Sequence, residues 1–187
     1  WVYTDITERK QADIELRQSR QIFSSAFESC PIAASIATTA DGRFIEVNES
    51  FASQHGYRPG ELKGRSITDV YAPEQHAALF AQLREIDRCG QGVFESLHLR
   101  QDGSRFPVVM KITTLSDAQG RPTMRMAYSS DISQRKAIEA RLELLSQVVE
   151  QSPQAIVITN LESSIEYVNE AFVRNTGYSR EELLNQN

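Results

Sequence analysis

The sequence predicts an α+β fold in which a five-stranded antiparallel sheet carries its helices on one face. Three observations lead to this prediction: five short segments with the composition of β-strands, Asp-Gly turns between them, and one amphipathic helical segment after the second strand. The 187 residues are 40% hydrophobic and 24% charged, which is typical of a globular chain of one or two domains. A net charge of −5 argues against nucleic acid as a partner, since its binders usually carry a basic surface.

The strands and the long helix follow one another in a fixed order. Two strands begin at Ile32 and Phe44, and the Asp41-Gly42 turn joins them. A helix follows from Pro73 to Gly90, with an apolar stripe made by Ala77, Phe80, Leu83 and Ile86. Three further strands then begin at Val93, Arg105 and Pro122. This order predicts one complete sheet between about residues 30 and 134.

Two short sequence motifs, which we call words, each occur twice. The stretch VNESFASQHGY begins at Val47 and VNEAFVRNTGY at Val168, while DITERK begins at Asp5 and DISQRK at Asp131. Repeats at nearly one spacing predict tandem units. We expect the end of one unit at 1–7, a linker helix at 8–29, a complete unit at 30–134, a linker helix at 135–150, and the start of a further unit at 151–187. The last piece is too short to bury a large core alone.

The linker segments carry a heptad-like pattern. After Asp131 the apolar residues step by four, three and four positions, and after Asp5 the same phase is occupied: these are Ile138, Leu142, Leu145 and Val149, then Ala12, Leu16, Ser19 and Phe23. Such a seam predicts coiled-coil helices and a homodimer formed through them. The alternative is that each helix packs on its own domain.

The words, in this order, resemble the PAS sensory domain family. The resemblance rests on the Val-Asn-Glu word with Asn48, Glu49, Phe51, Gly56 and Tyr57, on LRQDGSRFPVVM in the second half, and on the Asp-Ile-Ser/Thr exit word. In that family the exit word joins the last strand to a signalling helix. The resemblance therefore implies relay residues Asp131, Ile132, Ser133 and Arg135, with Asp5, Ile6, Thr7 and Arg9 in the preceding copy.

The resemblance also implies a small-molecule pocket between the inner sheet face and the long helix. Strand alternation and the helix stripe select Phe80, Leu83, Leu97, Val108, Met110, Ile112, Met124 and Met126 as its lining. Filling of a core by the same side chains is the alternative.

The cofactor expectations follow from single residues. His76 lies earlier in the long helix than the haem ligand of similar proteins, so haem is disfavoured. The segment HGYRPGELKGRS lacks the cysteine of cysteinyl-flavin photosensors, and Cys89 is at the wrong end of the helix. Non-covalent flavin or a small metabolite stays open. The histidines His55, His76 and His98 are scattered without metal-ligand spacing, which favours structural roles.

No catalytic constellation is evident, and we interpret the chain as a regulatory rather than an enzymatic segment. The resemblance implies sensing and signal relay in a multidomain bacterial protein. The stretches SPQAIVITN, NTGYSREEL and DISQRK resemble the input regions of cyclic-di-GMP synthases and phosphodiesterases, so such an enzyme is the expected C-terminal effector. A sensor histidine kinase input region and a ligand-free dimerisation spacer are the alternatives. No apolar run is long enough for a membrane span, and two unpaired cysteines fit a cytoplasmic location, so no membrane contact is expected within this segment.

Overall fold

The computed structural model describes residues 7–184 of the chain, with side chains from residue 10. The chain divides into two compact units, Trp1–Ser133 and Gln134–Asn187, which are described separately. The strand expected at residues 1–7 falls almost wholly outside the described residues. Thr7, its last residue, begins a helix.

The first unit contains a long N-terminal helix, a five-stranded sheet and the helices that cover it. Its elements are α1 (Thr7–Glu28), β1 (Ala33–Thr38), β2 (Phe44–Val47), α2 (Glu49–Gln54), η1 (Ile67–Val70), η2 (Pro73–Gln75), α3 (His76–Cys89), β3 (Gln91–Leu99), β4 (Arg105–Ser116) and β5 (Pro122–Asp131). The strand order is β2-β1-β5-β4-β3, and every neighbouring pair is antiparallel. The predicted fold class is therefore confirmed.

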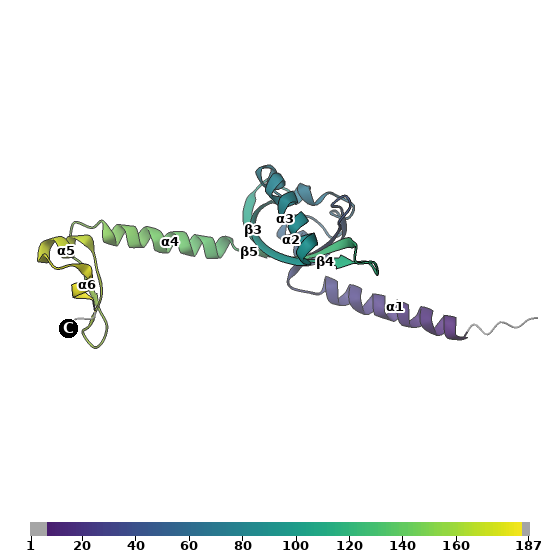
Figure 1. Ribbon diagram of the computed structural model, residues 1–187, viewed down its shortest axis with the longest axis horizontal. Helices are drawn as coiled ribbons and strands as arrows, with labels where there is room; N and C mark the ends of the chain where they lie inside the picture. The colour runs from purple at the N-terminus through teal and green to yellow at the C-terminus, as the bar shows by residue number, and fades with distance from the viewer. Residues whose placement is uncertain (1–6, 185–187) are drawn as a thin grey trace, which may run out of the picture. The chain divides into compact units, whose positions relative to one another are not determined.

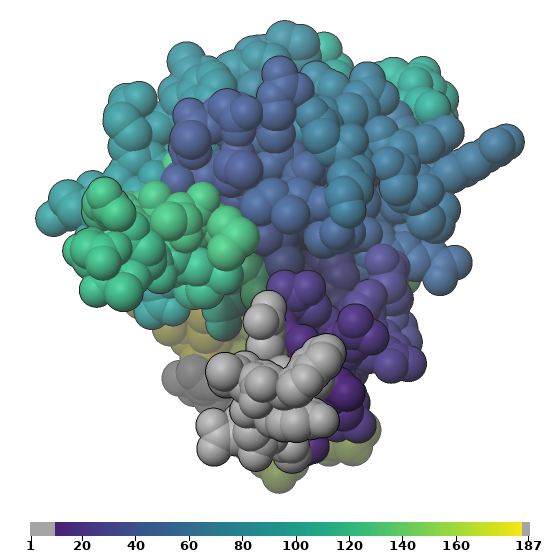
Figure 2. Space-filling model, turned by 90° about the vertical axis from the view of Figure 1, so that its right-hand side faces the viewer, coloured from purple at the N-terminus to yellow at the C-terminus, as the bar shows by residue number. Residues whose placement is uncertain are grey.

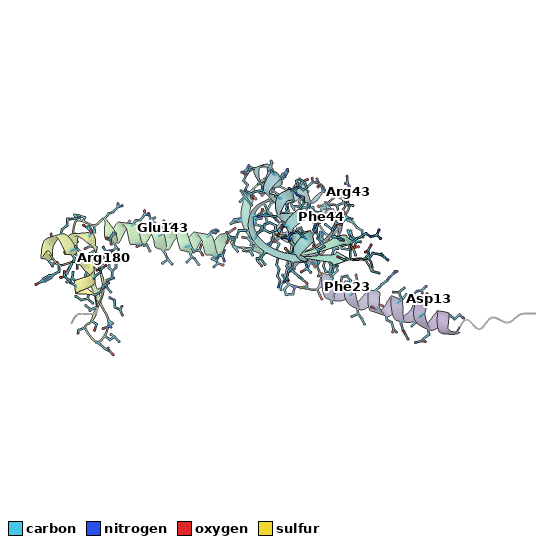
Figure 3. All side chains as sticks on the ribbon, in the orientation of Figure 1. Asp13, Phe23, Arg43, Phe44, Glu143 and Arg180 are labelled. Carbon is cyan, nitrogen blue, oxygen red and sulfur yellow. The ribbon has the colours of Figure 1, made fainter. Side chains whose placement is uncertain are left out.

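The sheet has an inner face, which curves round α2 and α3, and an outer face (Figure 1). Because directly opposite residues of an antiparallel pair share a face, the register assigns each strand residue to one of them. Met110 of β4 pairs with Ser129 of β5 and with Phe94 of β3, all on the inner face. Adjacent residues alternate: Phe44 lies in the body of the unit and Arg43 at its surface (Figure 3).

The inner face holds the main core. Leu79, Leu83 and Ile86 of α3 are buried against it. Ile86 lies so close to β3 that a Cβ added to Gly92 would approach its side chain to 2.6 Å. Glycine at that position is therefore what allows the close packing of α3 on the sheet.

The outer face is also apolar, and its cover comes from α1. Phe27 in the last turn of α1 packs against a cluster made of Ala34, Ile36, Ile45, Met124, Met126 and Tyr128. In the space-filling view the blue and teal residues of the unit form one continuous surface, with the purple residues of α1 beside it (Figure 2). Of the α1 side chains that the structure describes, Phe27 belongs to this cluster, while Phe23 one turn earlier is half-exposed (Figure 3).

The second unit contains most of α4 (Ser133–Glu150), β6 (Val157–Thr159), β7 (Ile165–Val168), α5 (Glu170–Thr176) and α6 (Arg180–Leu183). Its two strands pair antiparallel with each other. None of the residues in α4 is buried. Among the described residues, no helix combines the length and the apolar character that crossing a membrane requires.

Candidate functional site

Asn48 is the residue about which the first unit turns from strand to helix. Its side-chain oxygen accepts from the backbone N–H of Phe51, which caps α2, and from the N–H of Ala34 on β1, both at 2.9 Å. Its Nδ2 lies 2.8 to 3.3 Å from the carbonyl oxygens of Phe27, Cys30 and Ile32. Asn48 is fully buried. One side chain therefore ties the end of α1 to β1 and α2.

The rest of the Val-Asn-Glu word supports this turn. Glu49 lies in the first turn of α2, where a carboxylate suits the helix dipole. Phe51 is buried in the core, and Tyr57 packs partly against it. Gly56 has a φ of 76°, a left-handed conformation that glycine adopts without strain.

A second junction joins β5 to α4. Asp131, the last residue of β5, accepts the N–H of Ser133 at 2.8 Å and so caps the first turn of α4. Its other oxygen pairs with Arg100 Nη2 at 2.8 Å. Arg100 in turn lies over the ring of Phe106, 3.8 Å from its centroid, and donates through Nε to the carbonyl of Gln54. The start of α4 is thus linked to the core and to α2.

The other relay residues lie at or near this junction. Ile132 is buried, and its N–H donates to Pro107 on β4. Arg135 is half-exposed and forms an i,i+4 ion pair with Glu139 at 3.6 Å. Of the preceding copy, Asp5 and Ile6 lie outside the described residues, and Thr7 and Arg9 are described only as backbone of α1.

A small cavity lies between the inner face and the helices. Water-sized space within it is about 30 Å³, enough for one or two water molecules. Its walls include Tyr71, Leu83, Met110, Ile112 and Arg125. A flavin or a haem is far larger than this space, and a small metabolite could enter only if the side chains that line the cavity moved apart.

Arg125 supplies the charge at this cavity. Its guanidinium binds Asp87 of α3 through two contacts, Nε–Oδ1 at 2.9 Å and Nη2–Oδ2 at 2.5 Å, and the Arg125 side chain is only 10% exposed. Thr114 also donates to Asp87. A buried charge needs such a partner. The same arginine borders a second, more open groove of about 370 Å³ beside Phe80 and Arg84.

Four of the predicted pocket residues are misplaced. Phe80 is 47% exposed, because Leu79, Leu83 and Ile86 form the inward stripe of α3. Leu97 of β3 pairs with Pro107 of β4, and by strand alternation from the inward pair Phe94 and Met110 it lies on the outer face. Met124 and Met126 belong to the cluster on the outer face. The inward residues of β5 are instead Arg125, Ala127 and Ser129. Leu83, Val108, Met110 and Ile112 face inward, and of these Val108 does not line the cavity.

Two histidines expected to be scattered are in contact. His55 Nε2 lies 2.8 Å from His98 Nδ1, and both side chains are fully buried. Burial lowers the pKa of His55 to about 4 and lowers that of His98 as well, so both rings are neutral at pH 7. They are 43 positions apart in the sequence, and no local pattern marks their contact.

The hydrogen-bond partners assign the tautomers of this pair. His55 Nδ1 lies 2.8 Å from the carbonyl of Phe51, which can only accept, so Nδ1 carries the hydrogen. His55 Nε2 is then an acceptor, and His98 Nδ1 donates to it. His98 Nε2 remains a buried acceptor, and it has no partner among the described residues. His76, in contrast, lies partly buried with Nε2 3.2 Å from the carbonyl of Tyr71.

The model of the PAS domain family matches residues 31–134, more than half of the chain. The chain belongs to the PAS domain family. A second model, described as the PAS fold, matches residues 143–187, so the two PAS segments are in tandem.

Similar proteins are found among signalling proteins. The chain is 28% identical over 160 residues to the biofilm dispersion protein BdlA of Pseudomonas aeruginosa, covering 79% of this chain and 36% of that protein. It is 24% identical over 123 residues to sporulation kinase C of Bacillus subtilis, covering 66% of this chain and 29% of that protein. The chain thus spans about a third of the length of these relatives.

Solved PAS structures share the fold. The PAS domain of an HTR-like protein from Haloarcula marismortui superposes with a TM-score of 0.55 and is 27% identical, covering 66% of this chain and 99% of that chain. The chain is accordingly a PAS sensory segment of the kind found in signalling proteins.

Proposed function

We propose that the first unit senses a small molecule in its inner cavity and relays the change through the junction of β5 with α4 to a C-terminal effector. The observation that carries this proposal is the double role of Asp131. One of its oxygens caps α4 while the other holds Arg100, which packs on the core residue Phe106. A change in the position of Arg100 therefore acts on the first turn of α4.

We propose that Arg125 is the residue that binds the ligand. It lines the cavity and is held by Asp87 of α3 through two short contacts. A small ligand with a carboxylate or another hydrogen-bond acceptor would compete with Asp87 for the guanidinium. Such competition would loosen α3 from β5, and β5 is the strand that ends in Asp131.

The relay works through a dimer in this proposal. Ile138, Leu142 and Leu145 follow the heptad-like spacing along α4, and each is at least half-exposed. In α1 the matching positions Leu16 and Phe23 are also half-exposed. Burial of such stripes against a second copy would remove apolar surface from water and fix the rotational phase of the helices.

For the effector we propose a cyclic-di-GMP synthase or phosphodiesterase, since the repeated words resemble the input regions of those enzymes. A histidine kinase is the second candidate, and the similarity to a sporulation kinase favours it.

Deletions in α1 test the relay in the parent protein. Removal of Gln18–Gln21 takes out about one helical turn and nearly keeps the phase, so effector output should persist. Removal of Gln18 and Ser19 alone rotates the following helix by about 200° and should abolish regulation. Output is measured as cyclic-di-GMP synthesis or as autophosphorylation. Equal tolerance of the two deletions would contradict a relay that depends on helix register in α1.

A further inference from the structure

We propose that the first unit has a second binding site, a polar pocket beside the start of α4 that takes a small neutral or cationic carboxamide. The pocket lies between the segment Pro31–Ala33, the helix α2 and the last residues of β5. Its volume is about 290 Å³, and it shares no lining residue with the inner cavity. The binding claim does not depend on the proposed relay.

Two buried polar atoms at this pocket point to a ligand. Gln54 Oε1 and Ser129 Oγ are both buried, and neither has a hydrogen-bond partner in the described part of the chain. Ser129 is only 2% exposed. An unpaired buried polar atom destabilises the folded protein. Both residues line the same pocket, so a small rotation of the two side chains would let one molecule satisfy both atoms.

The surrounding groups decide which chemistry fits. Asp131 lines the pocket, and its carboxylate, although engaged by Ser133 and Arg100, disfavours an anion there. Ser50 donates its hydroxyl hydrogen to the carbonyl of Cys30 and so offers only lone pairs to a ligand. A ligand that fits this pocket therefore needs a hydrogen-bond donor directed towards Ser50 and Gln54 and an acceptor for the hydroxyl of Ser129.

A carboxamide meets these needs with one planar group. Its NH2 donates and its carbonyl accepts, and it pairs with the side-chain amide of Gln54 whichever way that amide is turned. An added ammonium group would gain from the nearby Asp131 carboxylate. Glycinamide has both groups and is the probe that we expect to bind best. Acetamide, which is neutral, should bind more weakly, and acetate should not bind.

Binding is tested on the whole 187-residue chain by NMR. Glycinamide, acetamide and acetate are titrated separately, up to about 100 mM, since small probes bind in the millimolar range. Glycinamide should shift the side-chain amide signals of Gln54 and the backbone signals of Ser129, Ser130 and Asp131. Absence of these shifts, or shifts confined to residues of the inner cavity, would overturn the proposal.

Variants give the second readout. Ser129→Ala and Gln54→Leu should each weaken glycinamide binding at least tenfold. Ser129→Ala should raise the stability of the ligand-free protein, because it removes a buried hydroxyl that has no partner in the part of the chain that the structure describes. Met110→Leu, a volume-conserving change in the inner cavity, is the matched control and should leave binding unchanged. Undiminished binding by Ser129→Ala would contradict the site.

Discussion

The two copies of the Val-Asn-Glu word form the same turn in very different surroundings. Asn169 accepts from the N–H groups of Ile156 and Phe172 and donates to the carbonyls of Val149, Ser152 and Gln154, which reproduces all five hydrogen bonds of Asn48. Gly177 repeats the left-handed conformation of Gly56.

Burial separates the two copies. Ile36 is buried in the first unit, while its counterpart Ile158 is 50% exposed. Tyr57 packs against the core, and Tyr178 is exposed. The described part of the second unit has a two-stranded sheet, whereas β3, β4 and β5 complete the sheet of the first. The word thus builds a local hydrogen-bonded turn, and distant strands supply the core.

Replacing each of the two asparagines in turn should give the largest difference in the stability of the first unit. Asn48→Ala leaves buried N–H and C=O groups of three elements unpaired, and we expect the first unit to lose about 4 kcal/mol of stability. Asn169→Ala is the matched control and should leave the first unit unchanged. Urea unfolding followed by the NMR signals of β5 measures both. Equal loss in the two variants would contradict the account.

The next largest difference in stability is expected between a residue on the inward side of α3 and one on its outward side. Leu83→Ala opens space in the core and should cost about 3 kcal/mol in the free energy of unfolding. Phe80→Ala removes a larger side chain from a half-exposed position and should cost less than about 1 kcal/mol. Thermal and urea unfolding of the two variants measure the difference. A greater loss for Phe80→Ala would mean that the helix faces the other way.

The histidine pair should make the first unit sensitive to acid in a way that the second unit cannot be. His55 has a folded pKa of about 4 against 6.5 in the unfolded chain, so the unfolded state binds more protons between these values. Stability is fully present above pH 6.5 and falls as the pH drops towards 4, by about 3 kcal/mol from this residue. Urea unfolding of the first unit over this pH range measures the loss.

The second copy supplies the control for the pH dependence. Thr176 occupies the position of His55 and donates its hydroxyl to the carbonyl of Phe172 at 2.9 Å, as His55 Nδ1 does to Phe51. His55→Thr should therefore keep the local bond and reduce the pH dependence, leaving the contribution of the buried His98. An unchanged slope would show that other groups cause it.

The smallest effect is expected at the junction of β5 with α4. Asp131→Ala removes the cap of α4 and the partner of Arg100, and should cost about 1 kcal/mol. Asp131→Asn keeps an oxygen for the cap and loses only the ion pair, so it should cost less. Urea unfolding of the first unit compares the two. An equal loss in the two variants would place the energy in the ion pair rather than in the cap.

Those features of the fold that depend on neighbouring residues could be predicted from the sequence. Strand segments, Asp-Gly turns and the asparagine turn all depend on neighbouring residues, and alternation placed Met110 on the correct face of β4. It failed on β5, because the inward residue Arg125 is charged while Met126 is apolar and lies outside. The outer face is apolar because Phe27 of α1 covers it, and nothing within β5 reveals that cover.

The site was less predictable for the same reason. In α3 both Leu79 and Phe80 are apolar, so two helix phases fit the pattern, and only packing against the sheet selects Leu79. The contacts of His55 with His98 and of Arg100 with Asp131 join residues 43 and 31 positions apart. Such contacts follow from strand register, which local composition does not specify.

Hydrogen exchange at the first turn of α4 tests the relay most directly. Amide exchange is measured residue by residue in the wild-type chain and in Arg100→Gln. In the variant, exchange should be faster at Arg135 to Ile138, while exchange of the strands β1 and β5 should stay unchanged. Identical exchange at the start of α4 in both proteins would contradict the claim that Arg100 and Asp131 couple the core to this helix.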